Sequence, residues 1–268
     1  MAGQLEGRVA PSPYGPWALI AGGSEGVGAA FARLLAREGI NSVLVARKPE
    51  QLEETAAEVI ALGAQVRTLA LDLTDPASTA RIADATADLD IGLLVLNAGA
   101  NAYDAPFAEG DLERFRVVVE LNVTVTMDLV HRFAPGLVAR GRGGILVMGS
   151  MAGYVGQRNI GVYAAAKAFQ RVLTESLWLE LQPQGIDVLH LVLGRTRTPA
   201  MERAGLRFDV PGLAVSDPED VAAEGWAHLA DGPVHFVGQG QRTAERLSRM
   251  PRDAVVRGHA EMLAKLMP

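Results

Sequence analysis

The chain has 268 residues, 49% of them hydrophobic, which is enough for one large α/β domain with a continuous core. Its formal net charge is −6 and its basic residues are scattered, which argues against a nucleic-acid-binding surface. The absence of cysteine excludes disulfides, thiol catalysis and metals bound by cysteine.

Residues 1–16 contain several prolines but no apolar run that could serve as a signal peptide. No segment has enough uninterrupted apolar sequence to span a bilayer. We therefore expect a cytoplasmic protein without a membrane span. The histidines show no metal-ligand spacing, so we also expect no bound metal.

Short apolar runs alternate with helical patterns along most of the chain. The predicted strands are residues 17–21, 42–46, 65–71, 91–96, 144–149, 186–193 and 234–237. The predicted helices are residues 26–38, a helix from Pro49, 76–87, a long helix 111–140 disturbed near Pro135, 162–182, and a helix from Asp217, with further helical stretches behind it.

Continuous runs of valine, isoleucine and leucine are typical of strands that are covered on both faces. Alternation of such strands with helices predicts a Rossmann-type, doubly wound parallel sheet flanked by helices, with right-handed crossovers. Because no linker, repeat or low-complexity tract divides the sequence, we expect a single domain over residues 1–268.

A glycine-rich turn, Gly22-x-x-x-Gly26-x-Gly28, follows the first predicted strand and precedes the first helix. Glycines let the backbone turn tightly and approach a pyrophosphate, and the helix N-terminus offers unpaired N–H groups. Tight turns also attract glycine, so the pattern alone is weak. Its place between strand and helix favours a dinucleotide-binding site.

Tyr163 and Lys167 are separated by one turn of the predicted helix 162–182, so both side chains project from the same face. A tyrosine with a pKa of about 10 is a poor base at neutral pH, but a neighbouring ammonium favours the phenolate and lowers that pKa. The pair would then donate and accept protons. The alternative is a surface lysine beside a half-buried tyrosine.

These motifs, in this order, make the chain resemble the short-chain dehydrogenase/reductase family over about residues 17–199. The family's glycine motif appears as Ala21-Gly-Gly-Ser-Glu-Gly-Val-Gly28, with Ala21 in place of a threonine. Its Pro-Gly-x-x-x-Thr motif is present only in part, as Leu193-Gly-Arg-Thr-Arg-Thr198. Its catalytic tetrad matches Asn122, Ser150, Tyr163 and Lys167.

The resemblance implies that the glycine turn, the strand ends, the catalytic helix and the partial motif bind a nicotinamide dinucleotide. The expected cofactor-binding residues are Gly22, Ser24, Gly26, Val27, Gly28, Arg47, Lys48, Asp72, Leu73, Asn97, Ala98, Gly99, Tyr163, Lys167, Thr196 and Thr198. Among them, Leu73 is expected to meet the adenine.

The end of the second predicted strand indicates which cofactor is preferred. Ala46 stands where NAD-binding relatives carry an aspartate, and Arg47 and Lys48 follow it with charge suited to an additional phosphate. We therefore expect NADP(H). The alternative is that both are ordinary solvated charges, and Glu25 in the glycine turn argues mildly against NADP(H).

The family's chemistry is reversible hydride transfer between nicotinamide and a carbonyl or alcohol carbon. The resemblance implies that Tyr163 is the general acid/base, that Lys167 lowers its pKa and holds the ribose, and that Ser150 binds the substrate oxygen. Asn122 is expected to orient a water that links Lys167 to solvent. Alternatively, Ser150 merely ends a strand and Asn122 is a polar break in a helix.

Residues 199–216 lie where this family has its substrate lid. The segment contains Met201, Leu206, Phe208, Val210 and Leu213, and Tyr154 and Val155 are expected to line the same pocket. Such walls suit an apolar ketone or secondary alcohol, such as a steroid, terpenoid, acyl chain or aromatic ketone, unless these residues pack into the core or an interface. The chain is most similar to the hydroxysteroid and long-chain 3-oxoacyl reductase branch.

The helices that start near 111 and 162 form the dimer surface in relatives. Leu173, Leu177 and Leu181 either contribute to it or face the sheet, and we expect a homodimer or homotetramer. The main alternative function is a non-catalytic NADP-binding regulatory protein. A methyltransferase would need an acidic residue near Ala46, whereas an epimerase or dehydratase remains open.

Overall fold

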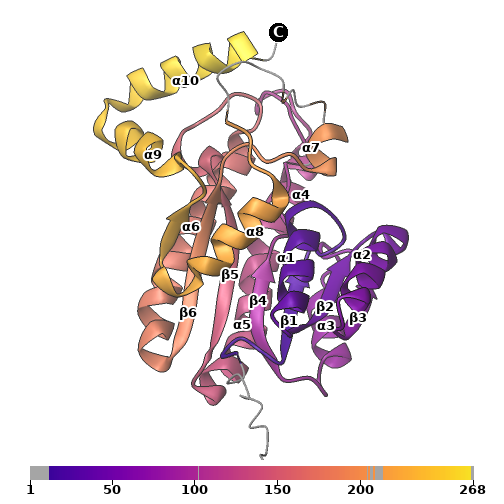
Figure 1. Ribbon diagram of the computed structural model, residues 1–268. Helices are drawn as coiled ribbons and strands as arrows, with labels where there is room; N and C mark the ends of the chain where they lie inside the picture. The colour runs from indigo at the N-terminus through magenta and orange to yellow at the C-terminus, as the bar shows by residue number, and fades with distance from the viewer. Residues whose placement is uncertain (1–11, 102, 204, 206–207, 209–213, 267–268) are drawn as a thin grey trace, which may run out of the picture.

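The computed structural model describes residues 12–266 except 102, 204, 206–207 and 209–213 (Figure 1). At its centre is a parallel sheet with the strand order β3-β2-β1-β4-β5-β6-β7. The strands are β1 (Trp17–Ala21), β2 (Asn41–Ala46), β3 (Val66–Ala70), β4 (Ile91–Leu96), β5 (Gly143–Ser150), β6 (Ile186–Leu193) and β7 (Val234–Phe236). The predicted single-domain, doubly wound fold is confirmed.

The strand order reverses between β1 and β4, which is where ligands bind in open sheets of this kind. The helices are α1 (Gly26–Arg37), α2 (Pro49–Ala61), α3 (Ser78–Ala85), α4 (Leu112–Val119), α5 (Val125–Arg140), α6 (Gly161–Leu181), α7 (Pro199–Arg203), α8 (Pro218–Ala227), α9 (Gly240–Arg249) and α10 (Arg252–Leu266). None of the helices in the described part of the chain is long and apolar enough to cross a membrane.

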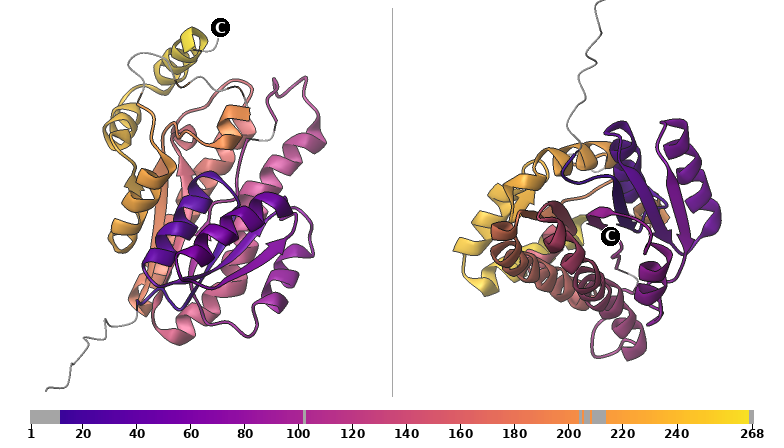
Figure 2. Two further views of the ribbon diagram at one scale, coloured as in Figure 1. Left: turned by 45° about the vertical axis from the view of Figure 1, so that its right-hand side comes forward. Right: turned by 90° about the horizontal axis from the view of Figure 1, so that it is seen from below.

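The sheet has a separate hydrophobic core on each face. Helices α1, α2 and α8 cover one face, where Phe31 and Leu35 are completely buried. Helices α3, α5 and α6 cover the other face, where Leu129 of α5 packs with Val147 and Val188 of the sheet. Figure 2 shows these two layers from further directions. Burial on both faces explains why the strands are uniformly apolar.

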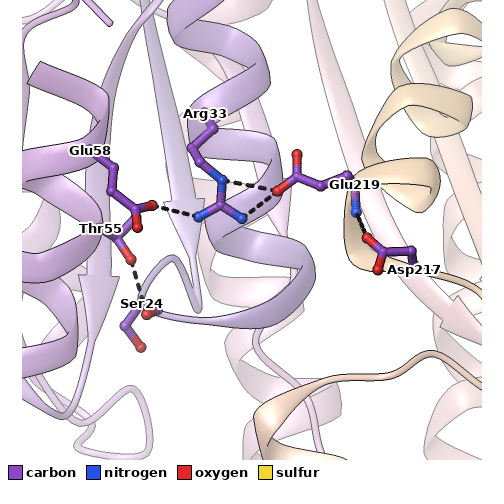
Figure 3. A network of polar contacts seen from close by, with 6 residues as sticks. All are labelled: Ser24, Arg33, Thr55, Glu58, Asp217 and Glu219. Atoms are coloured by element: carbon purple, nitrogen blue, oxygen red, sulfur yellow. Dashed lines mark hydrogen bonds and ion pairs between the residues drawn. The ribbon is translucent and has the colours of Figure 1, made fainter. Parts of the chain in front are cut away.

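Arg33 of α1 joins the three helices of the first layer (Figure 3). Its Nη1 donates to Glu58 Oε2 of α2 at 2.7 Å, and its Nε donates to Glu219 Oε1 of α8 at 2.9 Å. Beside this network, the Thr55 hydroxyl donates to the carbonyl oxygen of Ser24 at 3.0 Å. Helices α1, α2 and α8 therefore form one support for the glycine turn.

The predicted helix 111–140 is two helices, and the break is not where the sequence suggested. A π-helical turn, η1 (Glu120–Thr124), separates α4 from α5, whereas Pro135 lies within α5. Pro135 is exposed, so its missing N–H removes a hydrogen bond on the solvent side of the helix. The expected disturbance at Pro135 is therefore corrected to a π turn around Asn122.

Two of the three leucines in the predicted row on α6, Leu177 and Leu181, face the sheet. Leu181 is buried and Leu177 packs against the same core. Other apolar side chains of this helix, Phe169, Val172 and Leu179, are exposed. Of the two interpretations of the leucine row, contact with the sheet is correct for Leu177 and Leu181.

Candidate active site

The glycine turn packs directly against the end of β4. A side chain at Gly22, which has a φ of 82°, would place its Cβ 2.8 Å from the backbone nitrogen of Ala98. A Cβ at Gly28 would lie 2.0 Å from the Gly22 oxygen. Asn97 Nδ2 donates to that oxygen at 2.8 Å. Only glycine at these two positions permits so close an approach of backbone to backbone.

Helix α1 begins at this turn with unused backbone donors. Its N-cap residue, Glu25, makes no side-chain capping hydrogen bond, and the first turn of the helix contains no acidic residue. Glu25 instead forms an ion pair with Arg203 at the end of α7. Free N–H groups and the positive end of the helix dipole make this terminus suited to an anionic group.

Two cations stand at the end of β2. Arg47 and Lys48 are exposed, whereas Ala46 is buried. Partial burial acts to raise the pKa of Asp72, but hydrogen bonds from Thr74 and the charge of Arg47 outweigh it and hold that pKa below its ordinary value. Arg47 thus faces the end of β3.

The catalytic candidates meet where β5 ends and α6 begins. The Ser150 hydroxyl forms a hydrogen bond with Tyr163 and also accepts one from the backbone N–H of Ala152 at 3.1 Å. Lys167 Nζ lies 5.7 Å from the centroid of the Tyr163 ring. The three side chains that the sequence placed in one site are therefore brought together.

Burial determines the protonation of this pair. Burial raises the pKa of Tyr163, and the hydrogen bond from Ser150 offsets this only in part. Burial also lowers the pKa of Lys167 to about 7. The expected lowering of the tyrosine pKa by Lys167 is not found in the structure, because desolvation of the phenolate is the larger effect.

Asn122 holds the π turn beside Lys167. Its Nδ2 donates to Val118 O at 2.9 Å and to Ala100 O at 3.3 Å, while its buried Oδ1 has no partner. A Cβ on Gly99 would lie 2.7 Å from Asn122 Oδ1 and 3.1 Å from Lys167 Nζ. The free acceptor Asn122 Oδ1 and the ammonium of Lys167 thus both lie beside Gly99.

The segment that follows β6 folds back onto the glycine turn. The side chain of Thr198 occupies the space beside Gly26, whose Cβ would lie 3.0 Å from Thr198 Cγ2. The hydroxyl of Thr198 accepts a hydrogen bond from Met201 N at 3.2 Å. The Oγ1 of Thr196 is buried and has no partner. Thr198 is therefore close to the glycine turn, and the role expected for Thr196 stays a prediction.

Only part of the expected lid can be placed. Leu206, Val210 and Leu213 lie outside the described residues. Met201 is half-buried, and the Arg197 guanidinium lies 4.9 Å from the centroid of the Phe208 ring. The lid function of this segment stays a prediction.

Tyr154 and Val155 are held by neighbours outside the catalytic group. Val155 is buried, and the Tyr154 ring lies 5.4 Å from that of Phe236 and 5.2 Å from the Arg171 guanidinium. Arg252 donates to the carbonyl oxygen of Tyr154 at 3.3 Å, which ties the start of α10 to this turn. Their expected place in the substrate pocket is untested.

A cavity of about 440 Å³ opens at the N-terminus of α6. The loops after β4 and before α6 line it, with Ala105, Pro106 and Phe107 on one side and Arg158, Asn159 and Val162 on the other. Phe107 is 69% exposed and packs 5.3 Å from Phe115, measured between ring centroids. This wall was missed from the sequence, although the apolar run Ala105-Pro-Phe107 was visible there.

A completely buried histidine lies behind the catalytic strand. His190 of β6 has no hydrogen-bond partner for either ring nitrogen. Burial, together with the charges of Lys167 and Arg171, lowers the pKa of His190 to about 3. A Cβ on Gly149 would lie 2.3 Å from His190 Nε2, so the ring fills the space that a side chain at 149 would need.

Within the described residues, no group of three or more histidine, cysteine, aspartate or glutamate side chains could hold a metal ion.

The chain is similar to known proteins in sequence and in fold. A family model described as short chain dehydrogenase matches residues 16–206. The chain is 30% identical over 227 residues to a 7beta-hydroxysteroid dehydrogenase of Clostridium sardiniense, covering 84% of this chain and 87% of that one. It is also 36% identical over 194 residues to a very-long-chain 3-oxoacyl-CoA reductase of Neurospora crassa, covering 70% of this chain and 58% of the reductase.

Solved structures give the same result. A structure of a 7beta-hydroxysteroid dehydrogenase superposes with a TM-score of 0.84 at 26% identity, covering 91% of this chain and 96% of the other. A Sphingobium yanoikuyae short-chain dehydrogenase in complex with NADPH superposes with a TM-score of 0.77 at 31% identity, covering 88% of this chain and 97% of the other.

Proposed function

The chain belongs to the short-chain dehydrogenase/reductase family of oxidoreductases, and on that premise we propose that it transfers hydride between NADP(H) and an apolar ketone or secondary alcohol. The observation that carries this proposal is the convergence of Tyr163, Ser150 and Lys167 at the end of β5 and the start of α6. A positioned hydroxyl pair beside a buried ammonium suits proton transfer to and from a substrate oxygen.

Tyr163 is the proposed general acid/base. Bound nicotinamide would supply or accept the hydride. In the reductive direction the Tyr163 phenol protonates the developing alkoxide, and Ser150 donates a hydrogen bond to the same oxygen. Because burial raises the pKa of Tyr163, the phenol keeps its proton at neutral pH, which is the form that reduction needs. Reduction is therefore the proposed direction.

Lys167 and Asn122 have supporting tasks in this proposal. The ammonium of Lys167 stabilises the phenolate that Tyr163 becomes after it gives up its proton. The unpartnered Oδ1 of Asn122 and Lys167 Nζ both lie beside Gly99. A water held by Asn122 Oδ1 would return a proton to the site.

The residues present fit a dinucleotide. The uncapped start of α1 would bind the pyrophosphate, and the buried, unpartnered Oγ1 of Thr196 would bind a polar group near the nicotinamide. Exposed Arg47 and Lys48 beside Ala46 favour NADP(H) over NAD(H). Since Glu25 pairs with Arg203, its charge no longer argues against a phosphate. The remaining expected contacts, such as Leu73, stay predictions.

The proposed substrate is an apolar carbonyl compound or alcohol, such as a steroid or a long acyl chain. The names of the similar hydroxysteroid dehydrogenase and 3-oxoacyl-CoA reductase support this class. The cavity beside the start of α6 has a mixed wall, with apolar Ala105, Pro106 and Phe107 facing polar Arg158 and Asn159. The exposed Phe107 offers a flat aromatic surface in the wall of this cavity.

We further propose that the protein forms a homodimer through the outer faces of α4, α5 and α6. Val117, Met127, Phe169, Val172 and Leu179 expose large apolar side chains on these helices. Large apolar side chains that are exposed on neighbouring helices can form an interaction site, and this is the face that we propose.

A panel of ketones tests the proposed function. NADPH absorbance should fall when the protein is mixed with steroid, long-chain 3-oxoacyl or aromatic ketones, and more slowly with small polar ketones. Binding of NADPH without turnover of any ketone or alcohol would favour the non-catalytic regulatory alternative instead. The reverse reaction, oxidation of the matching alcohols with NADP⁺, is measured as well, so that an enzyme working mainly in the oxidative direction is also detected.

A further inference from the structure

The Lys167 ammonium is held by two neutral oxygens inside the protein. Only 2% of Lys167 is exposed. Its Nζ donates to the carbonyl oxygen of Met148 at 2.9 Å and to Oε1 of Gln170 at 2.8 Å. Gln170 is one turn further along α6 and is also buried. The second acceptor is thus a side chain and can be changed without altering the backbone.

The hydrogen bonds continue from Gln170 across to α5. Gln170 Nε2 donates to Thr126 Oγ1 at 2.8 Å, and Thr126 Oγ1 donates to the carbonyl oxygen of Asn122 at 3.0 Å. Gln170 is 1% exposed and Thr126 is 3% exposed. A buried chain therefore connects the ammonium of Lys167 to the π turn that holds Asn122.

This chain fixes the orientation of the Gln170 amide. A carbonyl oxygen can only accept, so the Thr126 hydroxyl must donate its single proton to the Asn122 carbonyl oxygen. Thr126 must therefore accept from Gln170, which turns the NH₂ group of the amide towards Thr126. The oxygen of the amide is left facing Lys167. The acceptor beside the ammonium is thereby specified by α5.

We propose that Gln170 is a positioning residue which keeps Lys167 protonated and in place beneath Tyr163. The catalytic part of this proposal rests on the proposed function, whereas the effect of Gln170 on the protonation of Lys167 does not. Hydrogen bonds to the charged form of a group favour that form. An ammonium has only donors to offer, so an apolar neighbour at position 170 would leave one of them unused in a buried site.

The other groups that face Lys167 do not supply this support. Tyr163 on α6 keeps its proton because burial raises its pKa, and His190 on β6 is neutral because burial lowers its pKa to about 3. Arg171, one turn after Lys167 on α6, forms an ion pair with Glu175 at 2.8 Å. Against these surroundings, burial lowers the pKa of Lys167 to about 7, so a neighbouring acceptor decides how much ammonium exists near neutral pH.

The protonation of Lys167 can be measured without substrate. The sequence has lysine only at positions 48, 167 and 265, so protein labelled with ¹³C-lysine gives one Cε signal for each in an NMR spectrum. Variants Lys48→Arg and Lys265→Arg identify the other two signals. A pH titration of the full-length protein then reports the midpoint of Lys167 directly.

Gln170→Met removes the acceptor at nearly constant length and should lower the Lys167 midpoint by about one pH unit. Gln170→Glu places a carboxylate at the same distance and should raise the midpoint. Thr126→Val should also lower it, because the amide of Gln170 is no longer held in orientation. Gln184→Met, on the exposed turn after α6, is the matched control and should leave the midpoint unchanged.

Opposite shifts in Gln170→Met and Gln170→Glu support the proposal, since a loss of packing alone would not reverse sign between them. An unchanged midpoint in Gln170→Met, or shifts of the same sign in both variants, overturns it. Gln170→Glu is nearly isosteric, and circular dichroism of each variant verifies the fold.

Turnover separates this proposal from the proposed function. If wild-type protein reduces ketones, the high-pH limb of kcat in Gln170→Met should move to lower pH by about one unit, because Lys167 loses its proton earlier. An equal loss of kcat at every pH would mean a structural role only and overturn the catalytic part. If the wild type reduces no ketone, the proposed function fails, while the NMR midpoints still decide the role of Gln170.

Discussion

Tyr163 and Lys167 share one face of α6, yet burial shifts their pKa values in opposite directions. Each shift favours the uncharged form, since the protein interior stabilises neither phenolate nor ammonium. The spacing of the two residues in the sequence predicts that they meet, but the depth of the site depends on packing that the sequence does not reveal. Hydrogen bonds from Ser150 and to Gln170 act against burial at the two positions.

Replacement of the catalytic phenol should remove turnover and leave cofactor binding intact. Tyr163→Phe is expected to lower kcat by about 10²–10⁴-fold, the usual contribution of a general acid/base. The dissociation constant for NADPH, measured by fluorescence, should change little. Tyr14→Phe is the control, because the Tyr14 hydroxyl donates to Asp187 near the start of β6, whereas Ser150 ends β5. A Tyr163→Phe variant that keeps most of its rate would refute the assigned role.

Arg47 should account for the preference for NADP(H). Loss of a charge-assisted hydrogen bond to the phosphate should lower kcat/KM for NADPH by about 10–100-fold in Arg47→Ala, with little effect on NADH. Arg81→Ala removes an exposed arginine that faces Asp75 and serves as control. Wild-type protein that uses NADH as well as NADPH would contradict the assignment.

At the scale of elements, the π turn around Asn122 is the feature that periodicity alone does not reveal. A π turn inserts one residue into a helix, which leaves the apolar pattern on either side helical. Pro135 gave the stronger local signal, yet α5 continues through it. The glycine turn was predictable because its backbone conformation depends on a few adjacent residues. The Gln170–Thr126 contact was not, because it depends on how α5 and α6 pack.

The π turn should depend on the Asn122 side chain. Asn122→Ala removes hydrogen bonds to Val118 and Ala100 and should lower the free energy of unfolding by about 1–3 kcal/mol. Urea unfolding followed by circular dichroism measures the change. Asn41→Ala is the comparison, since Asn41 Oδ1 accepts an exposed hydrogen bond from Gln65 N, and the loss of this bond should cost less. Equal losses in both variants would argue against the anchoring role.

At the scale of the molecule, the exposed apolar faces of α4, α5 and α6 should determine assembly. Val172→Glu places a charge in the proposed interface and should convert a dimer into a monomer in light scattering after gel filtration. Ile60→Glu tests an equally exposed apolar residue on α2, which lies on the other face of the sheet, and should not change the mass. A wild-type monomer at micromolar concentration would rule out the proposed dimer.

Buried His190 should make the protein sensitive to acid. Its pKa is about 3 in the folded protein and about 6.5 when unfolded, so below pH 6.5 the unfolded state binds the additional proton. Stability therefore falls as the pH drops from about 6.5 to about 3, by up to about 1.4 kcal/mol per pH unit from this group. His190→Leu should flatten that part of the profile relative to wild type, as measured by urea unfolding at each pH. Parallel profiles would exclude the histidine as the cause.

For the whole molecule, the alternation of strands and helices predicted the parallel sheet and the helix layers on its two faces, whereas the order of the strands is known only from the structure. The apolar strands specify a sheet covered on both faces, and the strand ends carry Asn97, Ser150 and the glycine turn to one edge. The wall around Phe107 and the buried contacts of Lys167 did not follow, since they arise between segments distant in the sequence. Much of the expected lid falls on residues outside those described.

The ring of His190 also constrains how this chain can change over evolutionary time. Because it takes the volume above Gly149, any mutation that adds a side chain at 149 collides with a ring from the neighbouring strand. The side chains at positions 149 and 190 therefore compete for the same volume next to Ser150. Lineages that enlarge one residue have to shrink the other, and Gly149→Ala should be tolerated far better together with His190→Ala than on its own.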